Sequence, residues 1–488
     1  MNKNAAEVRA GLAHPIIDAD GHFVELAPVF DEEMLTYLEE MGGKAVRDRY
    51  AGNTGLTDTT TVLASHPGAN GPGWRAMPSW WGWPTKNTRD RATSYLPALL
   101  YERLDEIGID FTILYPSMTL SYLETSDDEL IGLRCRAANR ALANLYAPYR
   151  DRTTVGALIP MMDPKQAVDE LEYAVRDLGF KTAVFAGHAK RPVGAGTGND
   201  TGNGTGNGTG EHRLDTFGVD SAFDYDPLWS KCVELGIAPV FHSSLQSHRV
   251  TRSATSYVYN HIGGLAANHE SLCKSLFLSG VTHRFPTLRF GFLEGGVAWA
   301  CSLFADLVGH WQKRNADDIQ NLDPDLLDVD ALVALFDQYG DARVRSGLAE
   351  LHAYFSRPSG RPEHLDEFAA AALRSVEDIR DRFVPNFYFG CEADDRLVAW
   401  AFDERINPAG ARLRPIFGSD VSHWDVRDMT EPVEEAYELV EDGIIDEAQF
   451  RELMFLNPAR LHAGMNPAFF DGTVCESAVR TALAEASP

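Results

Sequence analysis

Eight short apolar runs recur along this 488-residue chain, and longer segments with helical spacing separate most of them. Short apolar runs bounded by turn residues are typical of strands that are buried on both faces. Strands that alternate with helices favour a parallel sheet, and eight such units favour a closed (β/α)₈ barrel of the α/β class. The predicted strands are residues 16–22, 111–115, 154–159, 181–185, 237–241, 288–293, 387–390 and 415–417.

The segments between these runs have the spacing of amphipathic helices. In "DPKQAVDELEYAVRDLG", residues 163–179, apolar side chains recur with the helical period, and Asp163-Pro164 is a typical helix start. Residues 127–150 follow the same pattern. An open doubly wound sheet is the competing fold, but it would place a glycine-rich phosphate turn after an early strand. The first run ends in "DADGHFVE" instead, which favours the barrel.

Three segments interrupt the regular alternation of strands and helices. Residues 26–105 contain the aromatic stretch "PSWWGWPTKN", and residues 312–380 are helix-like and charged. Within residues 190–220, a run of Gly, Thr and Asn from 193 to 210 has nothing to bury and predicts a surface loop. We interpret all three as insertions in a single barrel domain that spans residues 1–488.

The composition excludes several classes of partner. With 71 acidic and 44 basic residues the formal charge is −27, which disfavours nucleic acid and anionic membranes as partners. No apolar run is long enough to span a bilayer. The N-terminal "MNKNAAEVRAGLAH" lacks the apolar core of a secretion signal, and the six cysteines form no CxxC pair. We therefore expect reduced thiols and a cytoplasmic protein.

Six of the eight predicted strands end in, or are closely followed by, a histidine or a carboxylate. In the first run, Asp18, Asp20 and His22 fall at every second position and so share one face of a strand. The later strand ends supply His188, His242, Glu294, Glu392 and Asp420, with His423 just beyond. In a parallel barrel these ends meet at one mouth, where crowded carboxylates would repel each other. A divalent cation removes that cost, and mixed imidazole and carboxylate ligands suit Zn, Mn or Fe.

These motifs resemble the amidohydrolase superfamily, in the amidohydrolase-2 branch of metal-dependent decarboxylases and related hydrolases. Asp20-x-His22 stands where that family has His-x-His, His242 in "FHSS" matches its strand-five ligand, and Asp420 in "GSDVSH" matches its strand-eight aspartate. Residues 279–296 resemble its segment from helix to strand six. The resemblance spans residues 16–457 and implies a TIM barrel with a metal at its mouth.

The chain departs from the family pattern at two positions. Asp20 replaces the first histidine, which makes the site richer in oxygen and shifts its preference towards Mn or Fe. Glu294 stands where the family's decarboxylases carry a histidine at the end of strand six. A carboxylate there suits a general base or a bridge to a second metal ion, and His188 offers an additional ligand.

The resemblance and the strand ends together give each candidate residue a role. The predicted metal ligands are Asp20, His22, His188, His242, Glu294 and Asp420, and the predicted catalytic residues are Asp420, Glu294 and His423. Trp81 and Glu392 are predicted to contact the substrate. We expect structural roles for Asp18 and for His14, His248, His261, His269 and His283.

Three functions follow from this set of residues. The first is a metal-dependent hydrolase or non-oxidative carboxy-lyase that acts on a small aromatic or cyclic carboxylic acid, using one or two divalent ions. The second is a dinuclear Fe or Fe/Mn oxygenase on the same barrel, suggested by the surplus of six ligands. The third is a non-catalytic partner subunit. By analogy with other barrels we expect a homo-oligomer, or a hetero-oligomer with a paralogue.

Overall fold

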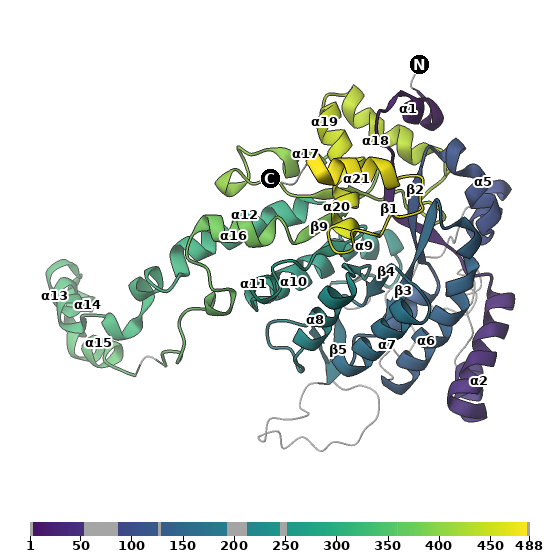
Figure 1. Ribbon diagram of the computed structural model, residues 1–488. Coiled ribbons are helices and arrows are strands. Elements are labelled where there is room, and N and C mark those ends of the chain that lie inside the picture. The colour runs from purple at the N-terminus through teal and green to yellow at the C-terminus, as the bar shows by residue number, and fades with distance from the viewer. Residues whose placement is uncertain are drawn as a thin grey trace.

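In the computed structural model, eight parallel strands form the predicted barrel (Figure 1). The structure describes residues 3–52, 86–124, 128–192, 212–244, 251–358 and 360–485. Along the sheet the strands follow chain order, and each observed strand lies within two residues of a predicted one. They are β1 Ile17–Phe23, β2 Phe111–Pro116, β3 Thr153–Ile159, β4 Thr182–Phe185, β7 Pro239–Phe241, β8 Phe290–Phe292, β9 Phe387–Cys391 and β10 Pro415–Phe417.

Backbone hydrogen bonds join the first and last strands at one end of the barrel. The Asp420 amide donates to the Asp20 carbonyl at 2.9 Å, and the His22 amide donates to the Val421 carbonyl at 3.0 Å. These bonds satisfy polar groups that would otherwise be unpaired at the edges of an open sheet. They also fix the end of β1 against the residues that follow β10, so two predicted site segments become neighbours.

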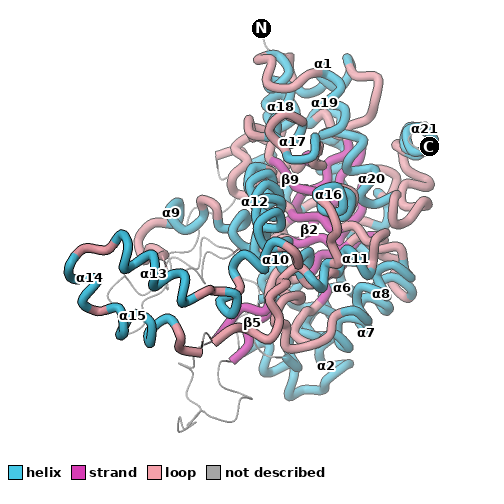
Figure 2. The backbone as a smooth tube through the Cα atoms, turned by 90° about the vertical axis from the view of Figure 1, so that its left-hand side faces the viewer, coloured by secondary structure: helices cyan, strands magenta, loops and turns pink. Residues whose placement is uncertain are grey.

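Helices surround the barrel strands, as Figure 2 shows with the strands in magenta. The predicted helix at 163–179 is observed as α7 Pro164–Arg176, because the Asp163 side chain accepts from the Gln166 amide and so caps its first turn. The predicted helix at 127–150 is α6 Asp128–Leu145. The other helices that follow or precede the strands are α5 Pro97–Ile107, α8 Asp226–Leu235, α10 Gly264–Leu278, α11 Val281–Arg284, α12 Ala298–Arg314, α16 Val376–Phe383, α17 Val398–Phe402, α18 Glu431–Glu441, α19 Glu447–Arg451 and α20 Asn457–Ala463.

The remaining elements lie at the chain ends, in the segments predicted as insertions and, for α9, between β7 and α10. Figures 1 and 2 both show α13 to α15 projecting away from the barrel beyond α12. Strands β5 and β6 pair antiparallel between residues 189 and 215, close to the predicted insertion at 190–220. The glycine-rich run 193–210 lies outside the described residues. These elements are α1 Ala5–Gly11, α2 Ala27–Gly52, α4 Thr88–Tyr95, β5 Ala189–Pro192, β6 His212–Asp215, α9 Tyr257–His261, α13 Val329–Tyr339, α14 Ala342–Ser346, α15 Leu348–Phe355 and α21 Glu476–Glu485.

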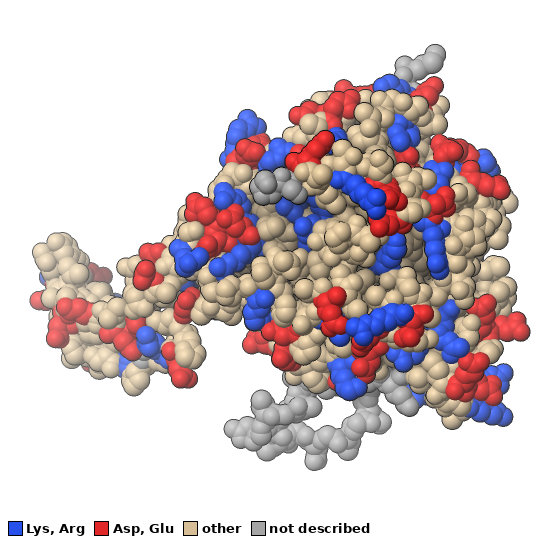
Figure 3. Space-filling model, in the orientation of Figure 1, with Lys and Arg blue, Asp and Glu red and all other residues tan. Residues whose placement is uncertain are grey.

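The distribution of surface charge and the state of the cysteines can be compared with what the sequence predicts. Acidic and basic side chains are interspersed over the face of the barrel shown in Figure 3. All six cysteines are buried and free. Within the described part of the chain, no helix combines the length and the apolar character that crossing a bilayer requires.

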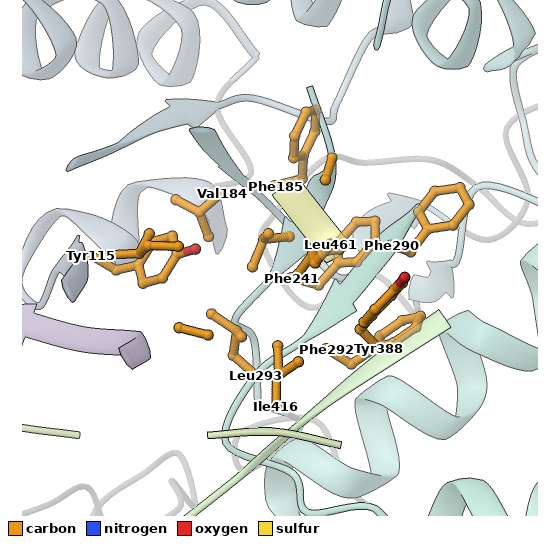
Figure 4. Close-up of a cluster of buried hydrophobic side chains, with 14 of the residues drawn as sticks. Tyr115, Val184, Phe185, Phe241, Phe290, Phe292, Leu293, Tyr388, Ile416 and Leu461 are labelled. Atoms are coloured by element: carbon orange, nitrogen blue, oxygen red, sulfur yellow. The ribbon is translucent and has the colours of Figure 1, made fainter. Parts of the chain in front are cut away.

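Aromatic side chains from neighbouring strands pack together in the core (Figure 4). The rings of Phe241 and Phe292 lie 5.6 Å apart, and those of Phe292 and Phe389 lie 6.0 Å apart, each pair stacked. Trp299 of α12 packs edge-on against Phe292 at 5.8 Å. This packing fixes β7, β8 and β9 relative to one another, and therefore fixes the polar residues that follow them.

Candidate metal centre

The predicted site residues converge at the carboxyl ends of the strands. Asp20 and His22 belong to β1, whereas His242, Glu294 and Asp420 follow β7, β8 and β10. Chain segments separated by up to 400 residues therefore supply side chains to one barrel mouth, as the alternation of strands and helices predicts.

Two of these residues have unusual backbone conformations. Glu294 has a φ of 55° and Asp420 has a φ of 50°, both in the left-handed region that residues other than glycine seldom adopt. Such conformations carry an energetic cost and are concentrated at functional sites. The fold holds these two carboxylates in place against a local preference, which is consistent with a role beyond packing.

Asp20, His22 and His242 form a first group of potential ligands, whose donor atoms all lie within 4.8 Å of one another. His22 Nε2 lies 3.5 Å from Asp20 Oδ1, and His242 Nε2 lies 3.9 Å from the same oxygen. The imidazole of His22 also faces Asp420, with 3.2 Å between Nε2 and Oδ1. Asp420 therefore lies at the edge of this group and completes the four ligands that the resemblance implies.

Glu294, Asp420, His423 and Asp425 form a second group with the same spacing limit. His423 Nδ1 lies 2.9 Å from Asp420 Oδ2, so His423 can orient that carboxylate. Glu294 lies between the two groups, because its Oε2 is 3.0 Å from His242 Nε2 of the first group. The two groups are thus adjacent rather than separate sites.

Unsatisfied buried atoms indicate that this constellation fits a cation. Among the described residues, no hydrogen-bond partner is found for Asp20 Oδ1, His22 Nε2, His242 Nε2, Glu294 Oε1 or Asp420 Oδ1. Burying such atoms without partners is costly, and buried polar groups in proteins are nearly always satisfied. The two imidazole nitrogens lie close to the oxygens of Asp20 and Asp420, and nitrogen and oxygen donors of this kind are those that Mn, Fe or Zn accepts.

The pKa values of the site residues also indicate that the buried carboxylates lack a positive partner. Burial raises the pKa of Asp20 and Asp420 well above the usual range, and the nearby carboxylate of Glu294 raises both further. Burial lowers the pKa of His242, but Asp20 and Glu294 outweigh it and raise this pKa to about 9. Burial lowers the pKa of His423 to about 4, so this imidazole is neutral at physiological pH. Protons therefore supply part of the charge that a cation would supply.

We expect the affinity for a divalent ion to fall as the pH is lowered. A cation and protons neutralise the same carboxylates, and the raised pKa values of Asp20 and Asp420 extend this competition above the usual range of a carboxylate. If binding of the ion releases one proton, the affinity should fall about tenfold for each pH unit by which the pH is lowered. Titrating chelator-stripped protein with Mn²⁺ from about pH 8 to about pH 5.5 measures the slope, and an affinity independent of pH would contradict this prediction.

His188 is buried next to the site, but it is not part of either ligand group. Its Nδ1 lies 2.9 Å from Asn268 Oδ1, on helix α10. Among the described residues, His188 belongs to neither set of donor atoms that lie within 4.8 Å of one another, so its predicted role as a ligand gains no support. Position at a strand end places a side chain at the mouth, but does not decide which neighbour it meets.

The two predicted substrate contacts differ in what the structure shows. Glu392 lines a cavity of about 260 Å³ at the mouth, together with Asp420 and Asp425. Burial and the neighbouring carboxylates, Glu294 first among them, raise the pKa of Glu392 to about 8. Trp81 lies outside the described residues.

Asp18 has the structural role that the sequence predicts. Its carboxylate is fully buried and accepts hydrogen bonds from the hydroxyls of Thr112 and Ser419 at 2.7 and 2.8 Å. The backbone amides of Ser419 and Asp20 also donate to it. Gly21 permits this arrangement, because a Cβ there would lie 2.5 Å from Thr112 Oγ1. Asp18 thus ties β1 to β2 and to the end of β10.

His261, predicted to be structural, lies at the site. Its Nε2 is 3.6 Å from Glu294 Oε1, and its Nδ1 is 3.9 Å from Asp425 Oδ2. His261 lies on the short helix α9, far along the chain from any strand end, so no sequence signal marks it. Asp425 was also missed, although its position two residues after His423 in "SHWD" is a signal that could have found it.

Aromatic side chains pack beside the second ligand group. Tyr257 stacks on His261 with ring centroids 5.0 Å apart, and Trp424 Nε1 donates to the Tyr257 hydroxyl at 2.8 Å. The ring centroids of Trp424 and His423 are 3.7 Å apart. The rings of Tyr257 and Trp424 cross at 80°, and Tyr257 is buried, so these rings pack against the imidazoles of the site.

Comparison with known proteins connects this geometry to a family. The family model described as amidohydrolase matches residues 17–462. The chain is 30% identical over 189 residues to a protein named Decarboxylase orsB from Emericella nidulans. That match covers 36% of this chain and 49% of the relative, so the chain spans about half the length of the curated relative it matches.

Two solved structures are among those to which this chain is similar. One is an amidohydrolase from Mycobacterium avium subsp. paratuberculosis, with a TM-score of 0.51 and 15% identity over 92% of this chain and 100% of that chain. Another is 5-carboxyvanillate decarboxylase LigW from Sphingomonas paucimobilis, with a TM-score of 0.49 and 15% identity over 92% of this chain and 99% of that chain. The predicted amidohydrolase-2 resemblance and the predicted barrel are confirmed. Since the family model covers most of its length, the chain belongs to the amidohydrolase family.

Proposed function

We propose that this protein is a metal-dependent carboxy-lyase that removes CO₂ from a small aromatic carboxylic acid without an oxidant. The observation that carries this proposal is the set of buried, unsatisfied donor atoms of Asp20, His22, His242 and Asp420 at the barrel mouth. The similarity to a protein named as a decarboxylase favours C–C cleavage over hydrolysis and over the oxygenase alternative.

The ligand residues would hold a divalent ion such as Mn²⁺, which would supply positive charge to bind an acidic substrate and to lower the pKa of bound water. The rest of the chemistry belongs to the chain's own residues. When the bond to the carboxyl carbon breaks, CO₂ leaves and the electron pair stays on the ring carbon, which then takes a proton. Asp420 and His423, with 2.9 Å between Oδ2 and Nδ1, would hold and deliver that proton.

The reaction itself tests this proposal. Protein loaded with Mn²⁺ and incubated without O₂ in deuterated buffer with small aromatic acids should release CO₂ and leave deuterium on the former carboxyl-bearing carbon. The variant His22→Ala should lose this activity together with its metal, whereas His283→Ala, an exposed histidine of α11, should retain both. No CO₂ release without O₂, together with O₂ consumption in a parallel aerobic incubation, would overturn the proposal in favour of an oxygenase.

The expected oligomer and the cytoplasmic location stay predictions. The arm formed by α13, α14 and α15 contains no buried residue, and it exposes Leu335, Tyr339 and Tyr354 by 51, 75 and 57%. Apolar side chains exposed to this degree on a projecting arm support a contact with another subunit.

A further inference from the structure

We propose that the amino-terminal end of the barrel contains a separate binding site for a small carboxylic acid with an apolar body. The site is a cavity of about 340 Å³, lined by the starts of β2 and β3, the residues that precede β4, the end of α6 and residues 469–473. A cavity of this size is within the range of small-molecule sites in proteins. The metal centre lies at the opposite, carboxyl ends of the strands, so this inference does not depend on the proposed function.

Apolar side chains form the buried wall of this cavity. Those that are at most 7% exposed and aromatic or branched are Phe111, Leu142, Tyr146, Val155, Phe180 and Phe469. The rings of Phe111 and Phe469 lie 6.4 Å apart and cross at 70°. A ring or a short aliphatic chain gains free energy by covering such a wall, because its own apolar surface leaves water. An inorganic ion gains nothing from it, so the wall favours a ligand with an apolar body.

Two basic side chains line the same cavity, and neither has a carboxylate partner in the described part of the chain. Lys181 is half-buried, and its Nζ donates to the carbonyls of Ala468 and Phe469 at 3.4 and 2.8 Å. Arg150 is exposed and forms no hydrogen bond or ion pair with another described residue. Asp471 is the only carboxylate among the described lining residues, and it pairs with Arg480 at 3.0 Å. The cavity therefore carries unpaired positive charge in a chain whose formal charge is −27.

The electrostatics of Lys181 and Arg150 favour an anion between them. Burial lowers the pKa of Lys181; Asp471 opposes this shift, whereas the positive charge of Arg150 adds to it. The carboxylate of a ligand would remove this repulsion between the two cations. A guanidinium can hold a carboxylate through two parallel N–H bonds, and Arg150 has its donors available for them. Wall and charge together therefore select a carboxylic acid with an apolar ring or short chain.

Calorimetric titration of the full chain tests this inference without any measurement of turnover. Protein stripped of metal by a chelator is titrated with benzoate, and separately with benzamide, a neutral molecule of nearly the same shape. We expect saturable binding of one benzoate per chain, and binding of benzamide that is weaker by about tenfold or more, because a hydrogen bond to a charged group is lost. Absence of saturable benzoate binding, or equal affinity for benzamide, would overturn this site and leave the proposed carboxy-lyase activity standing.

Two variants test where the benzoate binds. Arg150→Gln should weaken binding about tenfold, because it removes a charge without breaking a bond between described residues. Ala143→Phe should abolish binding, since Ala143 of α6 lines the cavity and a ring there would fill it. Arg345→Gln is the matched control, because Arg345 is an exposed arginine of α14 outside the cavity, and it should keep the wild-type affinity. Circular dichroism identifies the folded variants, and unchanged benzoate binding in Arg150→Gln, or in folded Ala143→Phe, would overturn the proposed site.

Discussion

Replacing Asp420 with asparagine is expected to lower kcat/KM for CO₂ release by about 10²–10⁴-fold, the range lost when a positioned acid or base is removed. Asparagine keeps the shape of the side chain and the backbone bond from residue 420 to the Asp20 carbonyl. It loses the negative charge that faces His22 at 3.2 Å, and it can no longer accept a proton from His423. Steady-state kinetics with Mn²⁺ in excess, alongside metal analysis, would separate loss of the proton acceptor from loss of the ion.

Asp428→Asn is the matched control for this substitution. Asp428 lies eight residues further along the same segment, and its side chain accepts from the Thr430 amide at 3.0 Å, which asparagine can also do. This variant should keep kcat/KM within about twofold, as is usual for substitutions that preserve a partly exposed contact. If Asp420→Asn were equally active, Asp420 would have no part in the reaction.

Replacing Asp18 with alanine is expected to cost about 3–5 kcal/mol of unfolding free energy, because several buried donors lose their acceptor and each unsatisfied donor costs about 1–3 kcal/mol. The substitution leaves four buried donors without their acceptor: the Thr112 hydroxyl, the Ser419 hydroxyl, and the amides of Ser419 and Asp20. These donors join β1 to β2 and to the end of β10, so the loss falls where the barrel closes. Urea denaturation followed by circular dichroism measures the change.

Thr112→Ser is the control for Asp18→Ala, because serine keeps the hydroxyl that donates to Asp18 and removes only a methyl group. We expect it to cost about 1 kcal/mol, the value for one buried methyl group. A loss below about 1 kcal/mol for Asp18→Ala would mean that water replaces the missing acceptor, and that this carboxylate is not what closes the barrel.

The barrel could be predicted from the sequence because its signal is local and repeated. Each strand is a short apolar run, and each helix has its own spacing and often its own cap, as Asp163 shows for α7. The parallel arrangement then requires the strand ends to meet at one mouth. This is why Asp20, His22, His242, Glu294 and Asp420, spread over 400 residues, could be predicted to converge before any contact was known.

Only the tertiary structure decided which of the converging side chains meet. His188 and Glu294 both follow strands, yet His188 pairs with Asn268 of α10 whereas Glu294 faces His242. His261 reaches Glu294 from a helix that carries no strand-end signal. The position of a residue in its strand decides at which end of the barrel its side chain lies, because each strand is determined by its own short apolar run. The direction of each side chain and its distance from its neighbours depend on how helices far along the chain pack against the barrel. The membership of the ligand groups is therefore known only from the folded chain.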